Sequence, residues 1–183
     1  MKAKQSKQLG KLLAFASAIV GLVAVIMIFL PQIVAASENS DTAYNGIAIA
    51  FGKTLYDKLG ITSKIDFSFL NLLCYLLVVV GLLLTVLQIC GICKSKLVTF
   101  ISAIAFIAGG ILFFFALNFS TITNSGSVSL PFLGEISSKG THKFAEANTE
   151  NYTAWKLGTG AIVGGITAIL AGIENIGRAI LTK

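Results

Sequence analysis

Hydrophobic residues gather in four long runs that are separated by polar segments. The runs cover about 12–34, 68–92, 97–117 and 157–177. Each run provides the roughly 20 residues that a helix needs to cross the hydrocarbon core of a bilayer. The pattern predicts an all-α membrane protein, a four-helix transmembrane bundle that forms a single domain over 1–183, with outer loops at 37–66 and 118–156.

The first run follows a basic N-terminus that contains Lys2, Lys4, Lys7 and Lys11. Pro31 lies near the far end of this run and should kink or end the helix there, because proline lacks a backbone donor. A cleaved signal peptide is the alternative, since residues 34–36 before Ser37 fit a cleavage site. The run exceeds the roughly 7 to 15 apolar residues of a signal peptide, which favours a retained first helix.

The last run carries a small residue at every fourth position: Gly160, Gly164, Ala168 and Gly172. Residues four apart lie on one face of a helix, so these positions form a smooth groove. Lipid solvates apolar side chains as well as another helix does, and a glycine face is therefore expected where a second backbone packs closely. We expect the other helices to dock onto this one, with Gly21 and Gly109 as further helix-packing residues.

Small and polar residues of the second run recur at alternating steps of three and four, which places them on one seam of the helix. Asn71, Thr85 and Gln88 are polar members of this seam. We predict that they face the bundle and form hydrogen bonds between helices. Alternatively they line a polar path, but no charged residue joins them, and this favours a packing role.

Both outer loops contain strand-like patterns. Residues 47–51 alternate large and small apolar side chains between Gly46 and Gly52, which predicts a strand, with an irregular loop as the alternative. Residues 53–59 are expected to form a short amphipathic segment at the membrane interface. Residues 128–136 predict one or two short strands that pair with 47–51. Together these segments predict a small extracellular β-sheet or ordered cap formed by the two outer loops.

The composition supports a membrane protein. Of the 183 residues, 55% are hydrophobic and 12% are charged, whereas charged residues make up about a quarter of soluble domains. The net charge of +6 comes from basic residues next to apolar runs, as expected for topology signals and contacts with lipid headgroups rather than with nucleic acid. Lysines occur in the N-terminal tail and in the short connector after Cys90, so we place both termini of a multi-pass plasma-membrane protein in the cytoplasm.

No convergent set of residues indicates a catalytic, cofactor or metal site. His142 is the only histidine and lies in a polar loop, and Cys90 and Cys93 form a CxxC spacing without a second pair. We expect free thiols there. Glu174 and Arg178 are four residues apart, which favours an ion pair near the inner headgroups. A proton or cation site at Glu174 is the alternative, since a carboxylate within a membrane helix is a functional candidate.

Four spans, inner termini, a short inner connector and a strand in the first outer loop resemble the claudin-like tetraspan layout. The resemblance implies a left-handed helical bundle capped by an extracellular sheet. It concerns architecture, because Trp155 is the only tryptophan and the claudin first-loop pattern of Trp, Gly-Leu-Trp and two cysteines has no counterpart here. The whole pattern, including Gly46–Lys53, is also similar to small four-span membrane proteins of low-GC Gram-positive bacteria, which implies a membrane location.

The abundance of packing surfaces and the lack of catalytic groups lead us to expect a non-enzymatic integral membrane protein. It would act through helix packing and outer-loop interactions. Its expected partners are membrane lipid and either a second copy or another membrane protein, with no cofactor and no nucleic acid. The alternative is an oligomeric channel or transporter subunit, in which the polar seam of the second run lines the conduit.

Overall fold

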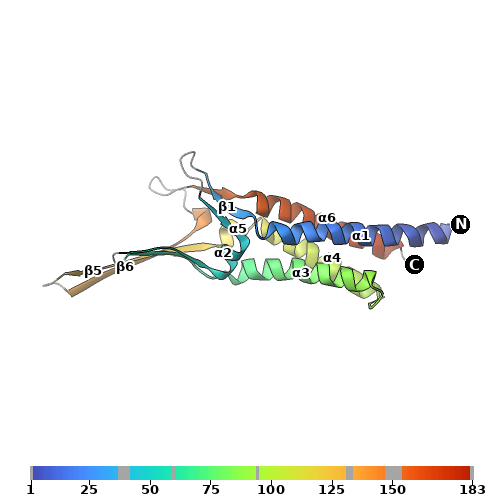
Figure 1. The fold of residues 1–183 in the computed structure, drawn as a ribbon, viewed down its shortest axis with the longest axis horizontal. Coiled ribbons are helices and arrows are strands. Elements are labelled where there is room, and N and C mark those ends of the chain that lie inside the picture. The colour runs from blue at the N-terminus through green and yellow to red at the C-terminus, as the bar shows by residue number, and fades with distance from the viewer. Residues whose placement is uncertain are drawn as a thin grey trace.

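Residues 2–36, 42–58, 61–93, 95–130, 134–146 and 154–181 are described by the computed structural model of the chain. They form four long helices, two short helices and two antiparallel β-sheets (Figure 1). The helices are α1 (Lys2–Met27), α2 (Gly46–Phe51), α3 (Phe69–Ile89), α4 (Lys96–Phe113), α5 (Ala116–Phe119) and α6 (Thr159–Leu181), with a 3-10 turn, η1, at Phe144–Glu146. The strands are β1 (Pro31–Ala35), β2 (Ala43–Asn45), β3 (Lys53–Lys58), β4 (Ile61–Ile65), β5 (Thr121–Leu130), β6 (Gly134–Lys143) and β7 (Trp155–Leu157).

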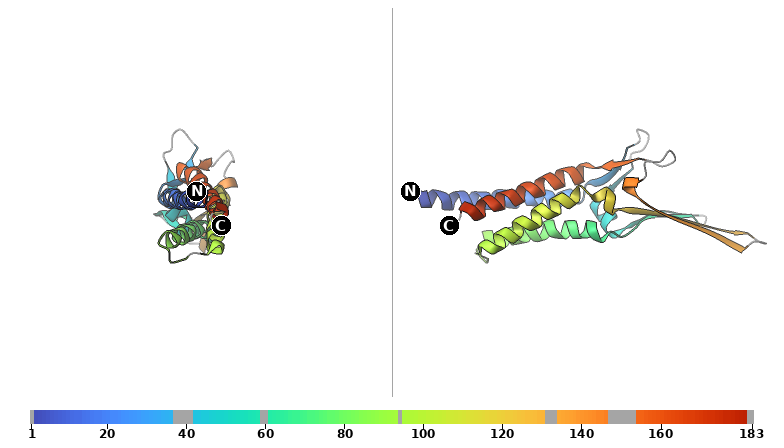
Figure 2. Two further views of the ribbon diagram at one scale, coloured as in Figure 1. Left: turned by 90° about the vertical axis from the view of Figure 1, so that its right-hand side faces the viewer. Right: turned by 180° about the vertical axis from the view of Figure 1, so that it is seen from behind.

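The long helices run side by side, with both chain termini at one end and the sheets at the other (Figure 2). We call these the terminal end and the sheet end. α6 packs between α1 and α4, and α3 contacts α4 and α1 to complete the bundle. Within the described residues, α1, α3, α4 and α6 are each long and apolar enough to cross a membrane. The prediction of four long apolar helices is confirmed.

Large apolar side chains cover the outside of the bundle. On α1 they recur at steps of three and four, and Leu12, Phe15, Ile19, Leu22 and Ile26 are between 49% and 67% exposed. In a water-soluble protein such a stripe would face a core. On the outside of a bundle it suits contact with hydrocarbon, which solvates these side chains well.

The first helix begins and ends earlier than the predicted run over 12–34. α1 ends at Met27, a turn follows, and Pro31 begins β1. Proline is tolerated as the first residue of a strand, and the backbone beyond it pairs with β2 and β7 instead of continuing a helix. α4 likewise ends at Phe113 rather than 117, and α6 continues to Leu181 rather than 177.

The predicted strand over 47–51 is wrong, because these residues form helix α2. The side chain of Asn45 caps this helix by accepting a hydrogen bond from the Ala48 amide at 3.0 Å. The residues that α2 buries are Gly46, Ile49 and Ala50, which follow the spacing of a helix face. A short alternation of isoleucine and alanine fits both periods, and the N-cap residue before it decides for the helix.

Two sheets form the cap, one with strand order β2-β1-β7 and one with order β3-β4-β5-β6, which we call the large sheet. The hairpin of β5 and β6, with 10 residues in each strand, extends away from the bundle (Figure 1). The expected ordered cap is present, but its strands differ from the prediction. Residues from 128–136 belong to β5 and β6, and β5 pairs with β4 rather than with 47–51. Residues 53–58 form β3 instead of an amphipathic segment, and 59–60 and 131–133 lie outside the described residues.

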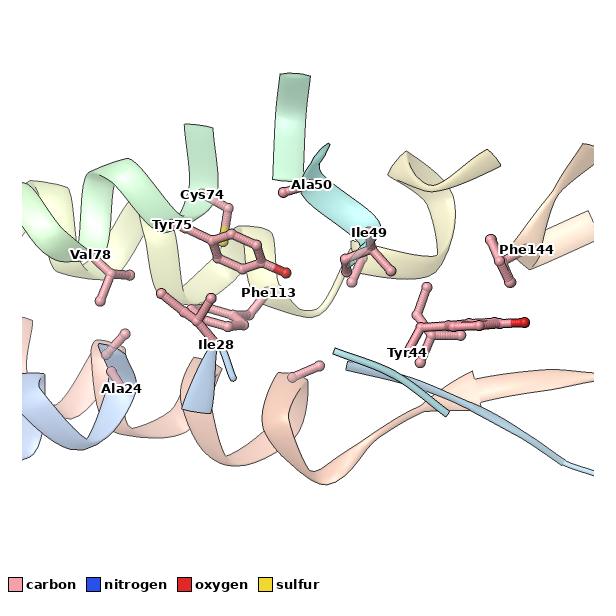
Figure 3. Packing of buried hydrophobic residues seen from close by; sticks show 14 of the residues in the cluster. Ala24, Ile28, Tyr44, Ile49, Ala50, Cys74, Tyr75, Val78, Phe113 and Phe144 are labelled. Carbon is pink, nitrogen blue, oxygen red and sulfur yellow. The ribbon is translucent and has the colours of Figure 1, made fainter. Parts of the chain in front are cut away.

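One continuous core joins the bundle to the cap (Figure 3). Its members include Ala24, Ile28, Cys74, Val78 and Phe113 in or beside the bundle and Tyr44, Ile49 and Phe144 in the cap. The Phe144 ring lies edge-on to Tyr44 and Trp155, with ring centroids 5.9 and 5.0 Å away, a favoured arrangement of aromatic pairs. Burial in this cluster raises the pKa of the Tyr44 phenol above its ordinary value. Apolar packing therefore fixes the sheet of β2, β1 and β7, which we call the small sheet, to the helices.

α4 and α6 approach each other backbone to backbone. A Cβ atom placed at Gly110 would lie 2.8 Å from the carbonyl oxygen of Gly165 and 3.0 Å from the amide nitrogen of Ile169. Both distances are well below the roughly 3.5 to 4.0 Å of an ordinary nonbonded contact. Only glycine fits at this crossing without moving one of the helices.

Gly110→Ala should therefore lower the free energy of unfolding by about 1 to 3 kcal/mol, because the added methyl group forces α4 and α6 apart. Gly177→Ala is the matched control, since a Cβ there meets only Leu13 Cδ1, at 3.6 Å. Alanine is preferred to glycine inside a helix by about 1 kcal/mol, so the control should be neutral or stabilising. Thermal unfolding in one detergent compares the two variants, and a Gly110→Ala protein as stable as the control would contradict the close crossing.

Candidate functional site

The small residues on α6 lie at its contacts with α1 and α4. Gly160, Gly164, Ala168 and Gly172 are all buried. A Cβ atom at Gly160 would lie 2.7 Å from the carbonyl oxygen of Met27 in α1, and one at Gly172 would lie 2.9 Å from that of Ala103 in α4. Gly164 meets Met27 of α1 and Phe113 of α4 at the sheet end, so the ridge contacts both helices there and follows α4 further toward the terminal end.

Gly21 and Gly109 make room for neighbouring helices. A Cβ atom at Gly21 would lie 2.5 Å from the ring of Phe106, a residue that is fully buried, and Gly81 faces the same ring. A Cβ atom at Gly109 would lie 3.1 Å from the carbonyl oxygen of Cys74. The Phe106 ring thus fills the centre of the bundle between two glycines, one from α1 and one from α3.

Three helices meet in a buried polar cluster toward the terminal end, formed by Thr85 of α3, Ser102 of α4 and Asn175 of α6 and called here the polar layer. All three residues are 0% exposed. Asn175 Nδ2 donates to Thr85 Oγ1 at 2.9 Å and to Ser102 Oγ at 3.1 Å. Both hydroxyls also donate to the carbonyl oxygen of Gly81, at 2.9 and 2.7 Å. Since buried polar groups are stable only when bonded, the polar layer fixes the relative positions of the three helices.

Further contacts surround Gln88, one turn closer to the terminal end. Gln88 Nε2 donates to Thr99 Oγ1 at 2.9 Å. Gln88 Oε1 accepts a hydrogen bond from Thr99 Oγ1 at 3.2 Å and another from Arg178 Nη1 at 2.8 Å. After the polar layer, these hydrogen bonds are a second polar connection from α3 to α4 and α6.

Glu174 contributes the carboxylate of α6. Its Oε2 atom is buried and has no hydrogen-bond partner among the described residues, and the same holds for Asn175 Oδ1. Arg178 Nη1 is directed to Gln88 Oε1. The predicted ion pair between Glu174 and Arg178 stays a prediction.

Asn71 lies apart from the other polar members of the seam, at the sheet end of α3. Its Nδ2 atom donates to Ser120 Oγ at 2.8 Å. Ser68 Oγ donates to the Phe119 carbonyl oxygen at 2.8 Å and also caps α3 by accepting from the Asn71 amide. The structure brings Thr85 and Gln88 near the polar contacts of α6, whereas Asn71 ties α3 to the segment that leads into β5.

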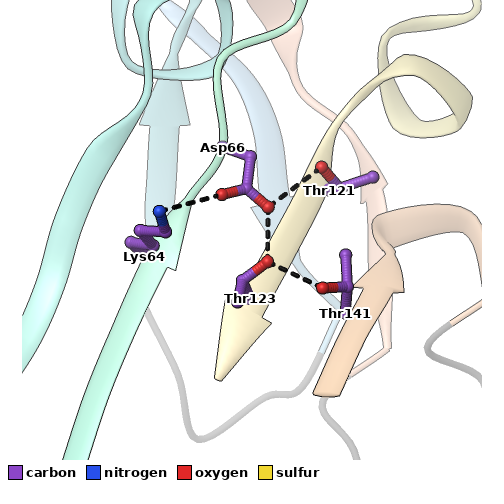
Figure 4. A network of polar contacts seen from close by, with 5 residues as sticks. All are labelled: Lys64, Asp66, Thr121, Thr123 and Thr141. Atoms are coloured by element: carbon purple, nitrogen blue, oxygen red, sulfur yellow. Dashed lines mark hydrogen bonds and ion pairs between the residues drawn. The ribbon is translucent and has the colours of Figure 1, made fainter. Parts of the chain in front are cut away.

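Asp66 forms a polar centre where the large sheet joins α3 (Figure 4). Its carboxylate accepts hydrogen bonds from the hydroxyls of Thr123 and, at 3.4 Å, of Thr121, and it lies 3.5 Å from the ammonium group of Lys64. Because the Thr123 hydroxyl donates to Asp66, Thr141 donates to Thr123 Oγ1, at 2.9 Å. One carboxylate thereby ties β4, β5 and β6 to the start of α3.

Beyond Asp66 the two edge strands of the large sheet, β3 and β6, are largely exposed where their side chains are described. Five of the six residues of β3 are exposed, as are residues 137–139 of β6. Among its described side chains, Tyr56 and Ile61 are the exposed large apolar ones, at 44% and 52%. Within the described part of the chain, β3 and β6 pair on one side only. They are therefore free edges, which present unpaired backbone groups.

The described residues contain no group of three or more His, Cys, Asp or Glu side chains that could hold a metal ion. Cys90 and Cys93 are not joined by a disulfide and lie just beyond the terminal end of α3, and Cys74 is buried. His142 lies in β6 opposite Ile122 of β5. The described residues also offer hydrogen bonds within the bundle and the exposed edge strands of the large sheet.

Comparisons with protein-family models, curated proteins and solved structures find no match to this chain. The similarity to claudin-like four-span proteins and to small bacterial four-span proteins therefore stays a prediction. The functional conclusion rests on the geometry of the chain's own residues.

Asn175 and Asp66 are candidates that the apolar pattern does not reveal. Asn175 lies three residues after Gly172 and so continues the small-residue face of α6, which is the signal that places it in the bundle. The signal for Asp66 is weaker. It becomes visible only once β4 and β5 are paired, because their register brings Thr123 next to Lys64 and so close to Asp66.

Asn175→Ala should lower the free energy of unfolding by about 1 to 2 kcal/mol, because it removes both hydrogen bonds from α6 to the polar layer. Thr167→Ala in the same helix is the control, since the Thr167 hydroxyl donates to the Val163 carbonyl oxygen of its own helix. Its loss should cost no more than about 0.5 kcal/mol. Denaturant or thermal titration in one detergent measures both, and equal costs would mean that the polar layer does not hold the helices.

Proposed function

We propose that the chain is a multi-pass, non-enzymatic membrane protein that acts by presenting its cap, above all the large sheet, to a partner outside the cell. In this proposal α1, α3, α4 and α6 form the transmembrane bundle and both termini are cytoplasmic. Two observations support the orientation. The termini share one end (Figure 1), as an even number of spans requires, and Lys11, Lys96 and Arg178 belong to the terminal half of their helices, in agreement with the positive-inside rule.

The main support for this proposal is the position and exposure of the large sheet. It extends beyond the bundle (Figure 1), and most of the described side chains of its two edge strands, β3 and β6, are exposed. A sheet with two solvated faces gains little from apolar burial, which is the main source of folding free energy. The fold of the bundle does not need this extension, whereas recognition of a partner does, because binding residues concentrate on segments that a rigid scaffold holds out.

An oligomeric channel or transporter subunit is the second candidate, and the polar layer is the observation in its favour. Polar residues inside a membrane helix often mark a conduction path. Here Thr85, Ser102 and Asn175 are fully buried, and Asn175 donates a hydrogen bond to each of the two hydroxyls. Such mutual bonding supports a packing role.

Thr85→Cys distinguishes the two candidates. In inside-out membrane vesicles, an impermeant maleimide should modify the exposed Cys90 and leave the thiol introduced at position 85 unmodified, because water does not reach the polar layer. Mass spectrometry of the same sample reads both sites, so Cys90 is an internal control. Comparable rates at the two positions would favour a conduit.

The large sheet can be shortened without disturbing the bundle. Asn124 and Gly140 are paired in register, and removal of residues 125–139 joins them directly. Asn-Gly is the preferred loop of a two-residue hairpin. The shortened hairpin would keep Thr123 and Thr141 as a pair, and with them the hydrogen bonds to Asp66.

This shortened variant should insert and unfold like the parent but lose its partner. The measurement is the mass and composition of the assembly extracted in membrane nanodiscs from cells that express either form. A thermal unfolding midpoint close to that of the parent shows that the bundle is intact. An unchanged assembly around an intact shortened protein would contradict the proposed role of the large sheet.

A further inference from the structure

The free edges of the large sheet run in opposite directions. β3 begins beside Ile65 at the base of the sheet and runs outward, while β6 returns from Gly134 to its base at Lys143. If two copies stand in one membrane with the same orientation, β6 of one copy and β3 of its neighbour are antiparallel. Two β6 edges, or two β3 edges, would meet as parallel strands, which pair slightly less well.

The register of the sheet shows which residues lie at the same level. Lys139 of β6 pairs with Ser125 of β5, Ser125 pairs with Thr62 of β4, and Thr62 pairs with Asp57 of β3. Residues paired in this way lie on one face of a sheet. An acidic side chain at one edge is therefore level with a basic side chain at the other edge.

The residues one level above and one level below Asp57 and Lys139 are also compatible with contact between the two edges. Tyr56 is level with Gly140, so the exposed tyrosine ring of one copy would lie over a glycine of the next. Lys58 is level with Ser138, which adds no repulsion. Along each row of an antiparallel sheet, hydrogen-bonded and non-hydrogen-bonded pairs alternate. In a sheet with an even number of strands, the outer side of the last strand therefore requires the same type of pair as the outer side of the first strand in a second copy.

We propose that the partner of the large sheet is a second copy of this chain, and that β6 of one copy pairs with β3 of the next through Lys139 and Asp57. This inference rests on the proposed function, since it names the partner of the same sheet. The contact joins two different edges. It therefore leaves one edge free on each side and produces a ring or a row of copies in the membrane, rather than a closed pair.

The contact between the two edges is short, and anchoring of both copies in one membrane compensates for its small size. The sheet has a bulge between Thr54 and Tyr56, so the regular part of the β3 edge spans only Tyr56, Asp57 and Lys58. In solution three residue pairs would not offset the loss of translational and rotational freedom. Copies anchored in one bilayer already share their height and orientation, and anchoring raises their effective concentration.

Disulfide trapping tests the contact directly. Two differently tagged chains, one with Asp57→Cys and one with Lys139→Cys, are expressed together and oxidised from outside. A mixed disulfide dimer is expected, and neither chain alone should form one. Asp57→Cys with Lys143→Cys is the control, since position 143 is on the same face of β6 but about 13 Å closer to the membrane, and no product is expected from it.

Exchange of the charges gives a second test that does not depend on thiols. Energy transfer between labelled copies in liposomes should fall about fivefold for Asp57→Lys or Lys139→Asp alone, because like charges then face each other across the edge. The chain that carries both substitutions should recover the parental signal, since each contact again joins an acid to a base. A double variant as weak as the single ones would overturn the pairing.

The results also separate this inference from the proposed function. A disulfide dimer from Lys139→Cys alone, or equal yields from positions 139 and 143, would overturn the β6–β3 contact. If the shortened hairpin loses a different protein while no 57–139 product forms, the large sheet binds a partner other than a second copy. The inference is then wrong and the proposed function stands.

Discussion

The close crossing of α4 and α6 is the constraint on which the rest of the bundle depends. Gly110 and Gly165 let the two backbones approach closely, and dispersion contacts along such a crossing replace the hydrophobic driving force that is absent in lipid. The crossing also brings α6 close enough for Asn175 to reach Thr85 on α3. A larger residue at either glycine would weaken the polar layer as well as the crossing, because the hydrogen bonds require the same short distance.

A close backbone contact at a glycine also holds the cap to the bundle. A Cβ atom at Gly158 would overlap the Pro31 carbonyl oxygen, so the chain entering α6 passes directly against the start of β1. Just before it, β7 pairs with β1, and the first and last long helices are joined above the bundle. The small sheet is therefore part of the helix packing, whereas the large sheet is attached through Asp66 and remains open to solvent.

Hydropathy and residue spacing are enough to predict the four long helices and the buried face of α6, because these follow from periodicity along one segment. The cap could be predicted only as an ordered region. Residues 47–51 fit a strand and a helix equally well, and the capping contact of Asn45 decides between them. The partner of β5 could not be read from the sequence, since pairing with β4 depends on how α3 and α5 bring residues 61–65 and 121–126 together.

The division between a packed bundle and an open sheet bears on where function can reside. Near the base of the large sheet, Asp66 accepts from two threonines and pairs with Lys64, so substitutions there alter how the sheet is held. Farther out, most of the described side chains of β3 and β6 are exposed, and substitutions at exposed positions usually change stability little. Residues that do little for folding and still place an acid, Asp57, at one edge level with a base, Lys139, at the other are the ones best suited to recognition.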